Sequence, residues 1–297
     1  MAPRYTNPGA AERGRPACEH AHPGGRWLGT AGTVTIVPMN AMSSTSNPAS
    51  AVASKVLRTT FPKAIPATGF VRATRELLAP HGFHVANTLP LIATCRDELA
   101  VTITARLYDT WGAGFNMAGL AGMIVLGRTG ILAASGHAPV EDGVRRFVLV
   151  ALPHIGIDAH GVIGNVDRPG VPGVSHTCGA LMALHDELRG DNAPTGDYPF
   201  LDLADPEQSM LRDKIPPFLP EGPLPDLAGL TRIARDVITA DTHKVIRVLR
   251  EGSSQPAQVA VFTGIHINGP GGTEFVEPGA CYLDLGADRP EIDLVVD

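Results

Sequence analysis

Two cysteines and one histidine are the residues of this 297-residue chain whose types are best suited to chemistry. Cys95 stands in ATCRDELA, where an apolar run gives way to charges, whereas a cysteine that only fills a core has apolar neighbours on both sides. His154 lies in the apolar run RRFVLVALPHIGI, and Cys178 lies in SHTCGAL. Two thiolates and an imidazole form a Cys2His set, which zinc binds tetrahedrally while a fourth position stays open to water.

The spacing of these three residues leaves other interpretations open. Cys95 and His154 are 59 positions apart, and His154 and Cys178 are 24 apart, so they form no local metal-binding finger. On spacing alone, two inert buried cysteines and a hydrogen-bonded core histidine explain the pattern as well. A thiol hydrolase with Cys95 as nucleophile is a third interpretation; its activity would be sensitive to alkylation and independent of metal.

The elements around Cys95 place it at a junction. The apolar run 90–95 predicts a buried strand, and the segment 97–111 predicts a helix with leucine or isoleucine at every fourth position. Cys95 then falls at the carboxyl end of a strand, and Asp97 falls at the amino end of the next helix. Ligands bind at such junctions in open α/β sheets.

The other two residues are expected on a strand and a helix. The segment 145–157 predicts a buried strand that carries His154, with 162–166 returning as its hairpin partner. The segment 175–190 predicts a helix capped by Ser175 or Thr177 and ended by Gly190. Cys178 would then lie near a helix N-terminus, where the free N–H groups stabilise a thiolate.

The rest of the chain alternates in the same way. A helix capped by Thr68, one or two helices over 226–252 and strands over 257–267, 280–286 and 291–296 predict an α/β fold. The connection 191–225 is rich in Pro, Gly and Asp. Such a long connection is typical of a lid or of a segment that covers a partner. We expect a poorly ordered leader over 1–55 and a single large domain over 56–297.

Composition argues against several classes of partner. The net charge is −6, basic residues are scattered, and aromatic residues make up 5% of the chain, so no nucleic-acid footprint is expected. No apolar run reaches the ~18–20 residues of a membrane span, and the N-terminus lacks a secretory apolar region. Four widely spaced cysteines are unlike a disulfide framework. A cytoplasmic protein with reduced thiols and no membrane partner is expected.

Several segments together resemble a known family. NTLPLIATCRDEL, WGAGFNMAGLAGM, GILAASGHAP, LPHIGIDAHGVIG and SHTCGAL are similar to segments of the limiting-CO2-inducible protein B/C family, the theta class of carbonic anhydrases. The resemblance runs from about Phe61 to the end of the chain, and CRDE, PHI and CGAL in that order are jointly specific. It implies a β-carbonic-anhydrase-like sheet flanked by helices, usually in a homodimer, with one zinc ion per active site.

The resemblance also assigns residues. It implies Cys95, His154 and Cys178 as the zinc ligands and Asp97 as the acidic catalytic residue, either accepting a hydrogen bond from zinc-bound hydroxide or ligating zinc in a resting state. A plain helix N-cap is the alternative for Asp97. The β-class pattern C-x-D-x-R continues with an arginine, but Leu99 stands there. We therefore expect the guanidinium to come from Arg96 or Arg168. Of these two, Arg96 is counted among the expected catalytic residues.

The function implied is a zinc carbonic anhydrase that interconverts CO2 and bicarbonate by attack of a zinc-bound hydroxide. The alternative is a catalytically silent family member that binds zinc and acts as a binding or assembly protein in inorganic carbon handling. His137, in SGHAP, is expected either to shuttle protons or to have no role.

Overall fold

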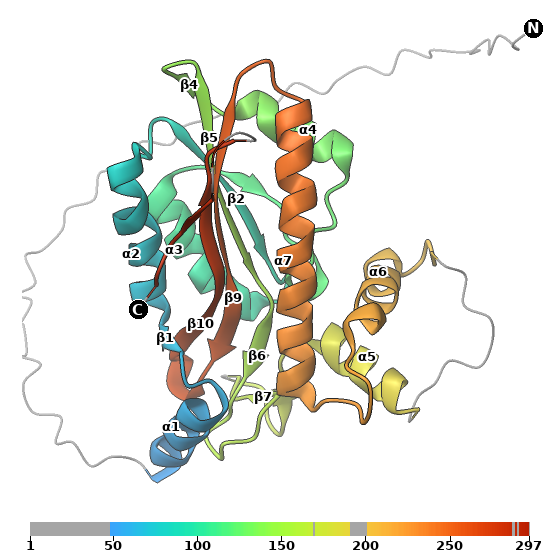
Figure 1. Ribbon diagram of the computed structural model, residues 1–297. Coiled ribbons are helices and arrows are strands. Elements are labelled where there is room, and N and C mark those ends of the chain that lie inside the picture. The colour runs from blue at the N-terminus through green and yellow to red at the C-terminus, as the bar shows by residue number, and fades with distance from the viewer. Residues whose placement is uncertain (1–47, 169, 191–200, 287–288, 290, 297) are drawn as a thin grey trace, which may run out of the picture. The chain divides into compact units, whose positions relative to one another are not determined.

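The computed structural model describes residues 48–168, 170–190, 201–286, 289 and 291–296 (Figure 1). Most of the predicted leader, residues 1–47, lies outside the described residues. Residues 48–55 instead belong to helix α1 (Pro48–Thr60), so the expected boundary at residue 55 falls inside a helix. Its residues Ala53, Val56 and Leu57 pack with isoleucines of the central sheet, which explains why this segment is helical and ordered.

A mixed sheet forms the centre of the domain (Figure 1). Its long strands are β2 (Thr88–Thr94), β5 (Val144–Leu152), β9 (Ala257–Asn268) and β10 (Glu274–Asp284). The order is β1-β10-β9-β5-β2-β3, with β2, β5 and β9 parallel and β10 antiparallel to β9. Short strands complete it: β1 (Ile65–Pro66), β3 (Phe115–Asn116), β4 (Val140–Glu141), β6 (His154–Gly156) and β11 (Ile292–Asp293).

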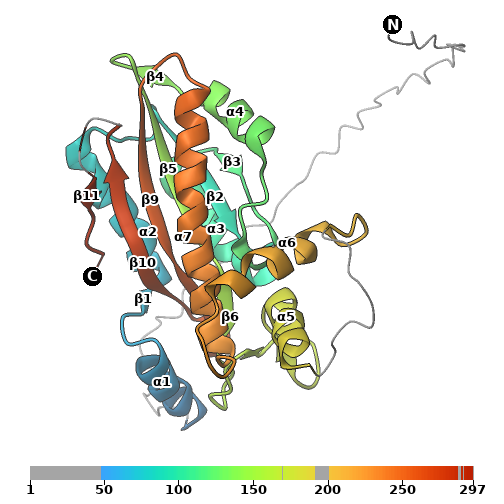
Figure 2. The ribbon, with the colours of Figure 1, turned by 45° about the vertical axis from the view of Figure 1, so that its right-hand side comes forward.

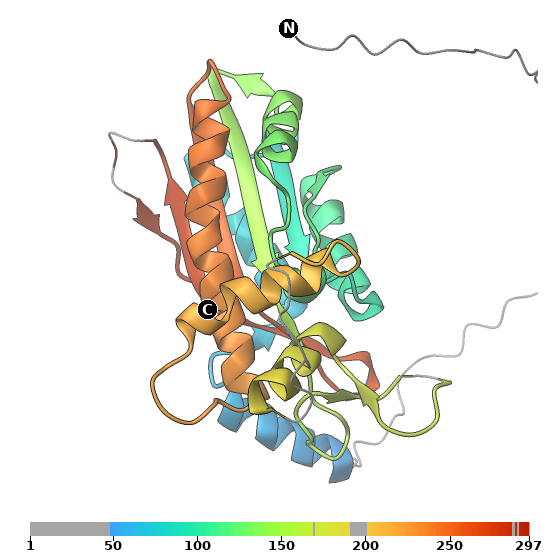
Figure 3. The ribbon, with the colours of Figure 1, turned by 90° about the vertical axis from the view of Figure 1, so that its right-hand side faces the viewer.

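Helices cover both faces of this sheet. The helices α2 (Ala67–Leu78) and α3 (Val101–Trp111) pack on one face, and α4 (Arg128–His137) and α7 (Leu227–Glu251) pack on the other (Figures 1 and 3). The helices α5 (Gly179–Arg189) and α6 (Pro206–Lys214) lie beside α7 (Figure 2). The predicted α/β class, with a sheet flanked by helices, is confirmed.

Strand β5 shows why the centre of the sheet is apolar throughout. Phe147, Leu149 and Ala151 contribute to the core beneath α4 and α7, whereas the residues between them, Val148 and Val150, contribute to the core beneath α2 and α3. All of these side chains are completely buried. Side chains alternate between the two faces of a strand, so a strand covered on both faces needs an unbroken apolar run.

Two predicted helix starts differ from the structure. Helix α2 begins after Pro66, and no side chain caps it, so the predicted cap by Thr68 is wrong. The predicted helix 175–190 begins only at Gly179, because 175–176 form the short strand β8 (Ser175–His176), which pairs with β7 (Asn165–Val166). Thr177 does not cap this helix either, because its hydroxyl donates to the carbonyl of Gly164.

Other boundaries follow the predictions more closely. The segment 97–111 is helical but begins with a 3-10 turn (Glu98–Ala100), and 226–252 is one helix rather than two. The hairpin expected between 145–157 and 162–166 is reduced to one bridge between Ile157 and Ile163, since Asn165–Val166 pairs with β8. Among the described residues, no helix combines the length and the apolar character needed to cross a bilayer.

Candidate metal centre

The three residues singled out by type come together at the carboxyl ends of neighbouring parallel strands. Cys95 directly follows β2, where it bridges to Gly119. His154 opens β6, just after Pro153 ends β5, because proline has no N–H to continue the ladder. Cys178 is the N-cap residue of α5. Since β2 and β5 are adjacent and parallel, their carboxyl ends present side chains to one place.

The side chains form a buried group that could hold a metal ion. The Sγ atoms of Cys95 and Cys178 and a ring nitrogen of His154 all lie within 4.8 Å of one another. The three residues are only 6%, 3% and 1% exposed. Within the described part of the chain, no other cluster of histidine, cysteine or acidic residues has this geometry.

Backbone strain marks the position of Cys178. Its φ of 46° and ψ of 67° lie in the left-handed region, which a residue with a Cβ seldom adopts. Such a conformation costs on the order of 1–3 kcal/mol and persists where surrounding structure holds it, commonly at ligand sites. The pairing of β7 with β8 fixes the chain immediately before Cys178 and so holds it in place.

The ring of His154 is held on one side only. Its Nδ1 lies 3.3 Å from Oδ1 of Asn268, the last residue of β9. Its Nε2 is buried yet forms no hydrogen bond with any described residue. A buried polar nitrogen without a partner is costly, and a metal ion next to the two sulfurs would satisfy it. The donor set therefore fits a metal.

The two neighbouring thiols differ in acidity, because the interaction between them shifts their pKa values in opposite directions. The hydrogen bond from the Cys178 thiol, helped by nearby His154, lowers the pKa of Cys95 to about 3. The same hydrogen bond, together with burial, raises the pKa of Cys178 well above its usual range. Cys95 therefore loses its proton more readily than Cys178, and a metal bound by both sulfurs must displace the proton of Cys178.

Asp97 lies at the edge of this group. Its Oδ1 accepts a hydrogen bond from the backbone N–H of Leu99 at 3.0 Å, which is the N-cap contact expected for the helix. Its Oδ2 lies 3.8 Å from Nε2 of His154. Burial raises the pKa of the Asp97 carboxyl above its ordinary value. The same side chain therefore caps the helix and borders the space next to Nε2 of His154.

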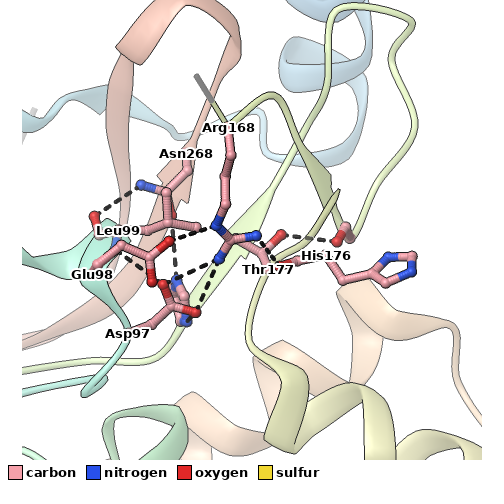
Figure 4. A network of polar contacts seen from close by, with 9 residues as sticks. Asp97, Glu98, Leu99, Arg168, His176, Thr177 and Asn268 are labelled. Atoms are coloured by element: carbon pink, nitrogen blue, oxygen red, sulfur yellow. Dashed lines mark hydrogen bonds and ion pairs between the residues drawn. The ribbon is translucent and has the colours of Figure 1, made fainter. Parts of the chain in front are cut away.

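Arg168 is the arginine that reaches Asp97. Its Nη2 lies 3.4 Å and 3.5 Å from the two carboxylate oxygens of Asp97 (Figure 4). Its Nε donates to Glu98 at 2.5 Å, and its Nη1 donates to the backbone carbonyl of His176 at 2.6 Å (Figure 4). The guanidinium that Leu99 cannot provide thus comes from a residue far along the chain, one of the two that the sequence proposed.

Arg96 is engaged elsewhere. Its Nη2 lies 2.8 Å from Glu207 of α6, and its Nε donates to both oxygens of that carboxylate. Glu207 also accepts a hydrogen bond from the backbone N–H of Leu120 at 2.7 Å. A forked guanidinium–carboxylate pair is stronger than a single contact, which explains why Arg96 turns toward α6. The partnership with Asp97 considered for Arg96 is not formed.

A small pocket gives access to the group. Its volume is about 290 Å³, and it is lined by Cys95, Arg96, Asp97, Leu120, Cys178, Gly179 and Ala180. Arg96 therefore lies at the wall of the pocket although it does not touch Asp97. Because Glu207 binds both Arg96 and the backbone of Leu120, α6 fixes two parts of this wall.

His137 lies away from this pocket. It is exposed at the end of α4 and lies beside Phe115 with the two rings tilted by 57° and their centroids 5.9 Å apart. Phe115 pairs with Leu91, four residues before Cys95 on β2, which corresponds to about 13 Å along a strand. The structure does not bring His137 to the candidate ligands, so no contact supports the proton shuttle that the sequence left open for it.

Replacing Arg168 with glutamine is expected to raise the pKa of the Glu98 carboxyl. The hydrogen bond from Arg168 lowers the pKa of Glu98 to about 2 from its ordinary value of 4.5. A depressed pKa means that this ion pair stabilises the fold above pH 4.5 and that the contribution fades as the pH falls toward 2. In Arg168→Gln, the pKa of the Glu98 carboxyl should rise clearly above 2 toward 4.5, as followed by carboxyl-carbon NMR, while the interaction with Asp97 still lowers it in part.

A matched control for that titration is Arg72→Gln. Arg72 forms an exposed ion pair with Glu76 within α2 and has no contact with Glu98. This variant should leave the pKa of Glu98 near 2. A Glu98 carboxyl that still titrates near 2 in Arg168→Gln would show that Arg168 is not its partner in solution.

Two residues of the site escaped the sequence analysis. Asn268 ends a strand whose sequence, TGIHIN, carries no recognisable signal for a histidine partner. Glu207 lies in DPEQSM, within the connection expected to be a lid or to cover a partner, and resembles any exposed helical glutamate. Only the packing of distant segments brings them to His154 and Arg96, so no local pattern could identify them.

Comparison with known proteins agrees with the fold and with the family resemblance. Residues 64–284 match the family model described as limiting CO2-inducible proteins B/C beta carbonic anhydrases. A solved structure of PtLCIB4, a homologue of the limiting CO2-inducible protein LCIB, is 26% identical; the match covers 81% of this chain and 99% of that one, with a TM-score of 0.68. The structure of LCIB itself is 28% identical, with coverages of 80% and 98% and a TM-score of 0.63.

No curated protein matches the chain significantly. The family match extends over most of the described domain, and it includes Cys95, His154 and Cys178. The resemblance drawn from CRDE, PHI and CGAL is therefore confirmed. This chain belongs to the limiting CO2-inducible protein B/C family, whose members are described as carbonic anhydrases of the beta type.

Proposed function

We propose that this protein is a zinc-dependent carbonic anhydrase that interconverts CO2 and bicarbonate. The observation that carries the proposal is the buried group of Cys95, His154 and Cys178, in which Nε2 of His154 has no hydrogen-bond partner among the described residues. Thiolate and imidazole ligands suit zinc, and three protein ligands leave a fourth position for water. The carbonic anhydrase description of the family supports the choice of reaction.

Zinc bound by these residues would supply a hydroxide nucleophile at neutral pH, by lowering the pKa of a water molecule toward about 7. Two thiolates neutralise the charge of the metal more than imidazoles do, so the water is less acidic than with three histidines. A hydrogen-bond acceptor beside the nucleophile then becomes important, because it orients a lone pair toward CO2.

We propose Asp97 as that acceptor. Its Oδ2 is 3.8 Å from Nε2 of His154, so it borders the space that a ligand of the metal would occupy. Arg168 holds the carboxylate from the far side and offsets its charge. Because burial and the neighbouring Glu98 raise the pKa of Asp97, a nearby guanidinium helps this carboxyl to remain an anion that accepts a hydrogen bond.

The pocket beside Cys95 provides room for the substrate. Leu120 and Ala180 contribute apolar surface to it, and Arg96 contributes a positive charge at its wall. An apolar wall suits uncharged CO2, and a guanidinium suits the bicarbonate anion that forms. We therefore propose that Arg96 binds bicarbonate, and not that it is the partner of Asp97.

The proposal extends to assembly and location. The protein acts as a homodimer in the cytoplasm, as the family resemblance and the reduced thiols of the ligand set suggest. Sedimentation of the purified chain and localisation of the tagged protein are the measurements that decide these two points.

Metal removal tests the proposed function against its alternatives. Dialysis against a strong chelator should abolish CO2 hydration, and zinc should restore it, because the nucleophile depends on the metal. Hydrolase activity that survives chelation and is lost on alkylation would favour Cys95 as a nucleophile instead. Zinc-loaded protein without any catalysed hydration would identify the chain as a silent, zinc-containing binding protein.

A further inference from the structure

Asn268 links the ring of His154 to the turn that carries Asp97. Its Oδ1 lies 3.3 Å from Nδ1 of His154, and its Nδ2 donates to the backbone carbonyl of Leu99 at 3.2 Å (Figure 4). Leu99 belongs to the 3-10 turn that Asp97 caps. One amide therefore contacts both the candidate ligand and the segment that holds the candidate acidic residue.

These contacts determine the orientation of the amide. A backbone carbonyl only accepts hydrogen bonds, so the atom of Asn268 that faces Leu99 must be the NH2 group. The amide oxygen then faces the histidine, and an oxygen of this kind only accepts. Nδ1 of His154 must therefore carry a proton, and in the neutral ring the lone pair resides on Nε2, the buried nitrogen that lies 3.8 Å from Oδ2 of Asp97 and has no hydrogen-bond partner among the described residues.

The backbone holds Asn268 firmly in this position. Asn268 is 5% exposed and pairs with Gly156 in the register between β6 and β9. Its carbonyl accepts a hydrogen bond from the N–H of Ile157 at 2.8 Å. The strand pairing thus fixes the distance between the residue that bears the amide and the short strand that begins with His154.

The neighbouring buried histidine has a different partner. His266 pairs with His154 in the same register, and its Nε2 lies 3.2 Å from Oε1 of Glu274, which also contacts Arg106. The histidine outside the candidate centre thus faces a carboxylate, whereas His154 faces a neutral amide. An amide orients the ring without adding negative charge beside the Cys95 thiolate and Asp97.

We infer that Asn268 is a positioning residue that fixes the Nδ1-protonated form of His154 and so presents Nε2 to the metal. The inference rests on the metal-binding part of the proposed function. Partners of metal-bound histidines commonly change metal affinity about 10- to 100-fold when they are removed. Asn268 would act through His154 and the Asp97 turn, without touching the metal or the substrate.

Zinc affinity, measured by competition with a chromogenic chelator, tests this inference independently of enzymatic activity. Asn268→Ala is expected to weaken zinc binding by about 10- to 100-fold, because the ring loses the acceptor that fixes it. Asn268→Asp is expected to keep the affinity within a few-fold of the wild type, since a carboxylate also accepts from Nδ1–H. The same variant should lower the melting temperature, because a carboxylate oxygen cannot donate to the Leu99 carbonyl.

A second buried asparagine provides the matched control. Asn87 is 1% exposed, precedes β2 at the opposite end of the sheet, and donates to the carbonyl of Gly82 at 2.9 Å. Asn87→Ala should lose thermal stability but keep wild-type zinc affinity. Equal losses of affinity in Asn87→Ala and Asn268→Ala, or unchanged affinity in Asn268→Ala, would overturn the inference.

A spectroscopic readout covers the case in which Asn268→Ala does not fold. Long-range proton–nitrogen NMR spectra of the zinc-loaded wild type should show His154 protonated on Nδ1, and a ring protonated on Nε2 would overturn the inference. Wild-type protein that binds no zinc would overturn both this inference and the proposed function. Wild-type protein that binds zinc while Asn268→Asp loses it as strongly as Asn268→Ala would overturn the inference alone.

Discussion

Replacing Cys178 with alanine is expected to abolish both stoichiometric zinc binding and CO2 hydration. The binding free energy of zinc in small protein sites is about 10–16 kcal/mol in total. The loss of one ligand among three or four therefore weakens binding by roughly 3 kcal/mol or more. That corresponds to a decrease in affinity of over about a hundredfold. The alanine leaves Cys95 and His154 without the third donor of a group whose atoms lie within 4.8 Å of one another.

The experiment combines metal analysis with stopped-flow CO2 hydration on the same preparation. Cys281→Ala is the matched control, because Cys281 is a half-buried thiol of β10 that lies outside the group, and burial raises its pKa to about 12. The control should keep its zinc and its activity. A full complement of zinc in Cys178→Ala would remove Cys178 from the ligand set.

Replacing Asp97 with asparagine is expected to lower kcat/KM for CO2 hydration by about 100- to 1000-fold while zinc content stays at the wild-type level. Asparagine has the same shape and is as good an N-cap as aspartate, so the contact with the N–H of Leu99 survives. The substitution removes the charge that faces Arg168 and the second oxygen near His154. The loss should therefore appear in catalysis rather than in folding.

Asp226→Asn is the matched control for that substitution. Asp226 caps α7 by accepting a hydrogen bond from the N–H of Gly229 at 2.8 Å, so both variants change a capping aspartate in the same way. The control should keep wild-type kinetics. Loss of zinc in Asp97→Asn would make Asp97 a metal ligand, as in the resting-state alternative, and wild-type kinetics would reduce it to a helix cap.

The parts of the site that depend on local sequence could be predicted. Cys95 follows a strand and Asp97 caps the turn after it, since an apolar run, a charged cluster and a helical period meet within a few residues. The fold class followed from the alternation of such runs. The start of α5 was misplaced because the pairing of β8 with β7, a contact between separate segments, overrides the local helical pattern.

The parts that depend on tertiary contacts could not be predicted. The sequence offered Arg96 and Arg168 as partners of Asp97 and left the choice between them open. The fold makes the choice, because Glu207 of α6 binds Arg96 and the loop before β8 brings Arg168 to Asp97. Asn268 was not considered, since a strand-end asparagine gives no sign of the histidine that it faces.

The most direct test of zinc catalysis is the rate of CO2 hydration by the wild-type protein, measured by stopped flow on a sample whose zinc content is determined in parallel. The proposal predicts one zinc ion per chain and a hydration rate that rises in proportion to the zinc-bound protein. One zinc ion per chain with hydration no faster than in buffer alone would contradict it.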